Sequence, residues 1–189
     1  SNQNTDTTWS VSIADVTATA TGATTRATGI DAKNSTLKLR NVTASAQSAT
    51  FNYGIHSHSS SVTIETTKAT ASGGSGINAG IFIEQAQEPL SAQLNNVIAE
   101  ADCDNCSETV GVETVGVYAS NARLIANNVT ATAEKSGLAI GIWVDISSDV
   151  NISNSTAYGI QANDNYGISV RNGSSATVND ITATGASTT

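Results

Sequence analysis

The stretch "LIANNVTATA", residues 124–133, recurs in related form along the whole chain. Apolar residues occupy its positions 1 and 3 before the Asn pair and its positions 6, 8 and 10 after it. Six further blocks share this pattern: VSIADVTATA from 11, LKLRNVTASA from 37, VTIETTKATA from 62, AQLNNVIAEA from 92, VNISNSTAYG from 150 and ATVNDITATG from 176. Successive blocks begin 26, 25, 30, 32, 26 and 26 residues apart. The chain is therefore one supersecondary unit of about 25 residues, repeated with two insertions.

A shorter block precedes every long block except the first. Its copies are GIDAK from 29, GIHSH from 54, GIFIE from 80, GVYAS from 116, GIWVD from 141 and GISVR from 167. Both kinds of block alternate with a period of two, which favours strands over helices. We predict that the second residue of each short block points inward, as do the alanines in the second half of the long blocks. Those second residues are Ile30, Ile55, Ile81, Val117, Ile142 and Ile168.

The fifth position of the long block explains why the apolar pattern changes phase. It holds Asp15, Asn41, Thr66, Asn96, Asn128, Asn154 and Asp180. Asn and Asp tolerate the left-handed backbone conformation better than other residues with a side chain. We predict a one-residue corner here, so that each unit holds three short strands.

These two blocks and the corner Asn resemble the repeats of a right-handed parallel β-helix of the pectin-lyase-like kind, and those of bacterial surface proteins and autotransporter passengers. The resemblance implies an all-β, single-domain solenoid of about seven coils with three short strands each. We expect a lead or cap over 1–10, the β-helix over 11–185 and a tail over 186–189. An extracellular or cell-surface location is also implied.

The composition excludes two classes of partner. The 189 residues carry a formal net charge of −8, whereas nucleic-acid binding needs basic patches. The chain has no apolar run long enough to insert into a membrane. It also has no Met, so we expect a mature or excised segment of a longer protein.

Stacking the short blocks would place their third and fifth residues in two outward columns. The third residues are Asp31, His56, Phe82, Tyr118, Trp143 and Ser169, and the fifth are Lys33, His58, Glu84, Ser120, Asp145 and Arg171. Parallel strands lie about 4.8 Å apart, so three aromatic rings would form a continuous exposed ridge. We interpret His56, His58, Phe82, Glu84, Tyr118, Trp143, Asp145 and Arg171 as a ligand-binding strip.

The strip predicts a binding or adhesion module that contacts a polysaccharide or another glycan, because aromatic faces beside polar groups suit sugars. A structural stalk or filament segment without a ligand is the alternative, with end-to-end self-association of the uncapped repeats. An enzyme, either a polysaccharide lyase or a glycoside hydrolase, is a further alternative. A glycosidase needs two carboxylates at a defined separation, and Glu84 and Asp145 stand two rungs apart. We assign no catalytic residue and no cofactor. Outward Thr pairs such as Thr130/Thr132 are typical of ice-binding solenoids, although Lys68 and other residues interrupt them.

The remaining motifs concern metals and thiols. His56 and His58 could share an ion with Glu84 one rung away, but exposed histidines more often face solvent, so we predict no metal site. Cys103 and Cys106 form a C-x-x-C pair in the larger insertion. The chain has no second Cys pair to complete a zinc site, and a redox role is the other alternative for this motif. We expect a local disulfide between these two cysteines.

Overall fold

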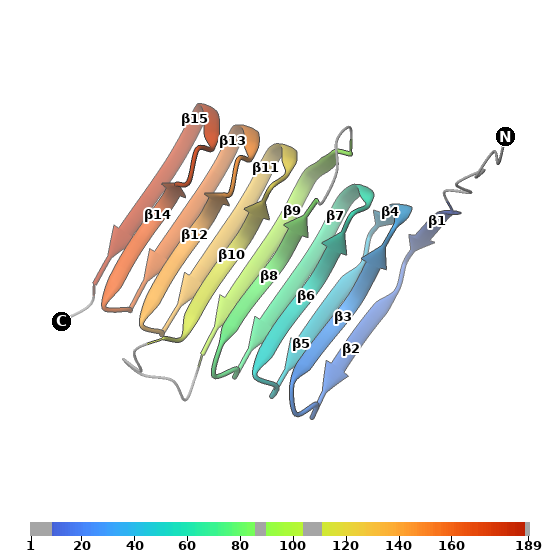
Figure 1. Cartoon of the computed structure of the whole chain (residues 1–189), viewed down its shortest axis with the longest axis horizontal. Coiled ribbons are helices and arrows are strands. Elements are labelled where there is room, and N and C mark those ends of the chain that lie inside the picture. Colours follow the sequence, from blue (N-terminus) through green and yellow to red (C-terminus); the bar gives the residue numbers. More distant parts are fainter. Residues whose placement is uncertain (1–8, 86–89, 104–110, 188–189) are drawn as a thin grey trace, which may run out of the picture.

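The computed structural model describes residues 9–85, 90–103 and 111–187. Within them the chain is a single all-β solenoid of about six turns, with strands paired in parallel and no helix. The coils stack along the long axis, so that β1 (Trp9–Ala14) lies at one end and β15 (Ser175–Ala186) at the other (Figure 1). The predicted single-domain β-helix is confirmed. No helix long and apolar enough to cross a membrane occurs in the described parts of the chain.

Two parallel sheets wind around one core. Sheet A has nine strands: β1, β2 (Thr17–Thr21), β4 (Ser35–Arg40), β5 (Thr43–Gln47), β7 (Ser61–Ser72), β9 (Ala92–Asp102), β11 (Arg123–Glu134), β13 (Asp149–Ile160) and β15. Sheet B has six: β3 (Arg26–Lys33), β6 (Phe51–His58), β8 (Ile77–Glu84), β10 (Glu113–Ser120), β12 (Leu138–Asp145) and β14 (Asp164–Val170). The short blocks of the sequence form sheet B and the long blocks form sheet A.

The predicted corner in the long block is confirmed. All seven residues at its fifth position have φ between 47° and 57°. The side chains there also join successive coils: Asn128 Nδ2 donates to Asn96 Oδ1 at 2.6 Å, and Asn41 does the same to Asp15. From β7 onward each long strand runs through its corner as one bent element, although the corner residue itself is left out of the register, so each coil there has two strands instead of three.

The interior is narrow and contains the alanines that the sequence predicts to point inward. Ile and Val side chains from sheet B pack against Leu, Ile, Val and Ala from sheet A in one continuous cluster. Ala131 is fully buried, as are its register partners Ala99 and Ala157. Each coil thus repeats the same small cross-section, which confirms the inward alanines.

The glycine of each short block is the point where the two sheets come closest. A Cβ added at Gly116 would lie 2.6 Å from the Gly141 carbonyl oxygen and 2.8 Å from the backbone nitrogen of Thr132 in β11. The backbone of sheet B therefore meets that of sheet A with no room for a side chain. The next residue, Val117, also points inward, so the strand bends between the two.

Candidate functional site

The two outward columns of sheet B are confirmed by the strand register. His56 pairs with Asp31 on one side and with Phe82 on the other, and Tyr118 pairs with both Phe82 and Trp143. In the second column His58 pairs with Glu84, Glu84 with Ser120 and Ser120 with Asp145. The site therefore contains the predicted neighbours in the predicted order.

The aromatic column is a closed stack of rings. The Phe82 and Tyr118 rings are 4.7 Å apart and tilted by 12°, and the Tyr118 and Trp143 rings have the same spacing and tilt. The Arg171 guanidinium lies 5.5 Å from the centre of the Trp143 ring, beyond the last aromatic. Each ring face is thus covered by a neighbour, and the column presents ring edges.

The expectation of an exposed aromatic ridge is wrong. Tyr118 and Trp143 each keep only 8% of their surface exposed, and His56 and Asp145 are buried as well. Phe82, His58 and Glu84 are partly exposed, and Arg171 is exposed. The rings point away from the interior as predicted, but they belong to a second apolar cluster on the outside of sheet B.

A third row of side chains, missed by the sequence reasoning, completes that outer cluster. Tyr53, Ala79, Val115 and Ile140 stand immediately before the glycines and pack with Tyr118 and Trp143. Because two successive residues, the glycine and the one after it, point inward, the outer face bends toward the core at this point. The bend brings the third row against the rings, as the 5.4 Å between the Tyr53 and Phe82 centroids indicates. The signal was present as an apolar residue before each of these glycines.

Asp145 links the aromatic column to the polar one. The Tyr118 hydroxyl donates to Asp145 Oδ2 at 3.4 Å, and Asn172 Nδ2 donates to the other carboxylate oxygen at 2.5 Å. Burial, reinforced by the Asp145 charge, raises the pKa of Tyr118 to about 12. Glu84 and Asp145 stand two strands apart in the register, as expected, which is about 9.6 Å at the spacing of a parallel sheet.

The histidines differ from each other. His56 Nδ1 lies 2.9 Å from Asp31 Oδ1, whereas His58 Nδ1 lies 3.0 Å from Glu84 Oε2. Burial lowers the pKa of His56, against the opposing effect of the Asp31 carboxylate. The assumption that both histidines face solvent is therefore wrong for His56, whose imidazole packs between the rings of Tyr53 and Phe82.

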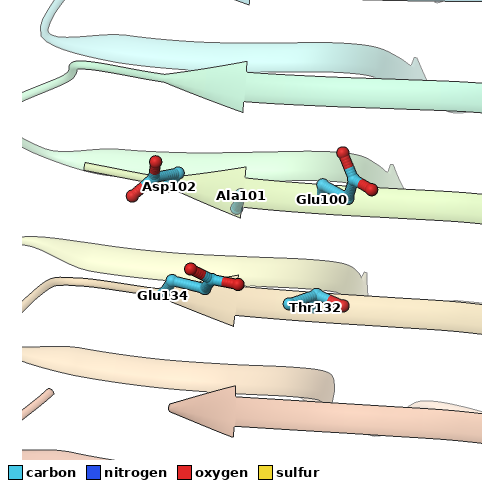
Figure 2. A pocket seen from close by; sticks show the side chains of 5 residues that line it. All are labelled: Glu100, Ala101, Asp102, Thr132 and Glu134. Carbon is cyan, nitrogen blue, oxygen red and sulfur yellow. The ribbon is translucent and has the colours of Figure 1, made fainter. Parts of the chain in front are cut away.

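A depression of about 310 Å³ lies on the outer face of sheet A, whereas the histidines lie on sheet B. Figure 2 shows Glu100, Asp102 and Glu134 around it, on the neighbouring strands β9 and β11. Lys68 pairs with Glu100 at 2.8 Å and Lys135 with Asp102 at 3.3 Å. Two of the three carboxylates are thus already neutralised by lysines.

The cysteine pair lies at the edge of the described residues. Cys103 is fully buried and is part of a disulfide. Cys106 lies outside the described residues, so its pairing with Cys103 stays a prediction.

No protein-family model, no curated protein and no solved structure matches this chain.

Proposed function

We propose that the chain is a structural module: a rigid β-solenoid segment that serves as a spacer or filament unit in an extracellular or cell-surface protein. The resemblance of its repeats to bacterial surface proteins and autotransporter passengers supports this location. The observation that carries the proposal is the state of the two end coils, whose interior side chains are uncovered.

Side chains at equivalent interior positions are exposed in the end coils and buried in the neighbouring coils. Val178 in β15 is 52% exposed, whereas its partner Ile152 in β13 is fully buried. At the other end Val11 is 45% exposed, although its partner Leu37 is buried. The exposed side chains occupy interior positions, and one more coil at either end would cover them.

The end strands also keep the pairing pattern that a further coil would need. Among the described residues, β1 pairs only with β4, and β15 only with β13. Such edges are templates for another strand, and natural sheets usually blunt them. Burying a Val or Ile side chain contributes about 1.5–3 kcal/mol, so covering both ends would stabilise the segment substantially. In this proposal the cover comes from a second copy placed head to tail, a contact that propagates instead of closing.

Glycan binding along sheet B is the second candidate. One feature favours it: the partly exposed Phe82 and Glu84 lie on the same face as the exposed Arg171. The stacking of the rings on one another weakens it, because sugars would pack on ring faces. A glycan array probed with the isolated segment tests this candidate.

The spacer proposal is tested by measuring the mass of the isolated segment across concentration, with electron microscopy of the same samples. We expect rods that lengthen with concentration. Val178→Lys should prevent growth, because it places a charge on the open interior of the last coil. Ile125→Lys is the matched control, since Ile125 is exposed on an outer face away from both ends.

A segment that stays monomeric at every concentration, and whose terminal coils bind no apolar dye and exchange amide hydrogens as slowly as the middle ones, would contradict the proposal. Equal loss of association in both Lys variants would also contradict it, because association would then not involve the ends.

A further inference from the structure

Four polar side chains from three consecutive coils meet at the histidine end of sheet B. Asp31 comes from β3, His56 and His58 from β6, and Glu84 from β8. Glu84 Oε2 lies 3.0 Å from His58 Nδ1 and 3.8 Å from His56 Nε2. One carboxylate oxygen therefore faces a nitrogen of each imidazole.

His56 is held rigidly and in one tautomer. Its side chain is only 6% exposed, and the Tyr53 and Phe82 rings lie 5.2 and 5.1 Å from its own. An ionised carboxylate can only accept, so the Asp31 contact places a proton on His56 Nδ1. In the neutral ring Nε2 then carries a lone pair and no hydrogen.

That lone pair has no hydrogen-bond partner. His56 Nε2 is buried, and no donor among the described residues reaches it. The charged atom facing it is the Glu84 oxygen, which is itself an electron-pair donor. A buried acceptor left unsatisfied costs about 1–3 kcal/mol, and a cation between the two groups would remove that penalty.

We propose that His56 Nε2, His58 Nδ1 and a Glu84 carboxylate oxygen bind a divalent transition-metal ion, with zinc as the reference ion. The ion replaces the proton through which His58 Nδ1 contacts Glu84, and His58 then carries its hydrogen on Nε2. One ligand atom of each residue lies within 4.8 Å of those of the other two. A tetrahedral zinc site with bonds of about 2.1 Å separates its ligand atoms by about 3.4 Å, so the present distances need only small side-chain adjustments. Two imidazoles and one carboxylate favour zinc, cobalt, nickel or copper over calcium and magnesium.

Asp31 positions the site without touching the ion. A carboxylate on the far nitrogen of a ligating histidine fixes the ring and raises its basicity. His58 and Glu84 are partly exposed, which gives the ion a path from solvent and leaves its fourth position to water. The bound ion would join β6 to β8, and through Asp31 it would couple to β3, so it would clamp three coils together.

The test uses protein from which metal has been removed with a chelator. Zinc is titrated into it and binding is measured by calorimetry, and cobalt is titrated into a second sample and binding is measured by visible absorption. We expect one ion per chain, a tetrahedral cobalt spectrum and a melting temperature that rises with free zinc. His58→Ala and Glu84→Gln should each weaken binding at least tenfold. Asp31→Asn should weaken it by about 10–100-fold while leaving the three ligands in place.

Glu100→Gln is the matched control, because it removes a carboxylate of similar exposure from the acidic depression on sheet A. Circular dichroism checks the fold of each variant. The substitutions are made at the partly exposed ligands His58 and Glu84, because replacing the buried His56 would also disturb its packing against Tyr53 and Phe82. Absence of stoichiometric binding to the wild-type chain overturns the proposal. So does binding that survives His58→Ala, or that weakens equally in Glu100→Gln.

Discussion

The two outer faces of the same coils differ in what they bury. On sheet B, Trp143 and Tyr118 point away from the interior and are nevertheless almost completely covered. On sheet A, Thr130 and Ile125 also point away from the interior and stay exposed. The composition of the rows contributes to this difference, and so does the direction in which each strand bends.

The bends are opposite. At Asn128 the strand turns where two successive residues, Asn127 and Asn128, face outward, so the outer face of sheet A is convex and its rows spread apart. At Gly116 the strand turns where two successive residues face inward, so the outer face of sheet B is concave and its rows converge. A concave face can bury large side chains without a covering layer.

The largest effect is expected where the concave bend depends on the absence of a side chain. Gly116→Ala would bring a Cβ against backbone atoms of both the next coil and sheet A. Backbone cannot yield as a flexible side chain does, so we expect destabilisation of more than about 4 kcal/mol, or failure to fold. Chemical denaturation measures this, with Thr130→Ala on the convex face as the control. A stable Gly116→Ala protein would mean that the sheets are further apart than described.

Next comes the ring stack. Trp143→Ala removes a buried ring from between Tyr118 and Arg171, and we expect a loss of about 3–5 kcal/mol. Ile125→Ala, on the exposed convex face, should change the free energy of unfolding by less than about 0.5 kcal/mol. Thermal melts of the two variants sharpen the comparison. If both lost the same stability, the two faces would not differ as described.

A smaller effect is expected inside the narrow core, which both faces share. Ala131→Leu would overpack the small space between the sheets and cost about 1–3 kcal/mol. Urea denaturation measures the loss. A neutral result would show that the interior beneath the convex face has room to spare, contrary to the full burial of Ala131.

The smallest effect concerns the tyrosine on the concave face. The raised pKa of Tyr118, about 12 against an ordinary value of 10, means that the folded state favours the neutral phenol. Its contribution to stability is therefore complete below pH 10 and is lost as the pH rises from 10 toward 12. Burial also raises the pKa of Tyr53. Ultraviolet titration of the phenolates should therefore show Tyr118 among the late-ionising tyrosines, and Asp145→Asn should move the Tyr118 pKa back toward 10. An unchanged titration in that variant would show that burial alone sets the value.

Much of the fold could be predicted from periodicity. The repeat of about 25 residues, the left-handed corner at residues such as Asn41 and the inward alanines were readable because each depends on local geometry or on a pattern repeated seven times. The columns of sheet B followed from the same repeat, since parallel strands in register place equal positions side by side. The count of strands per coil differs from the prediction only from β7 onward, where each long strand runs through its corner as one element, whereas the corner at Asn41 separates β4 from β5.

What the sequence determined by itself was therefore the order of neighbours: which coil follows which, and that His56, Phe82, Tyr118 and Trp143 share a column. Only the tertiary structure decided how far the side chains in this column are buried. The apolar residue before each glycine folds over the rings because the strand bends inward at Gly116 and its equivalents. Alternation along one strand does not encode that bend, which arises from the close approach of two backbones in the folded coil. The same bend buries His56 and leaves its Nε2 facing Glu84, which turned a pair of histidines two residues apart into a candidate metal site.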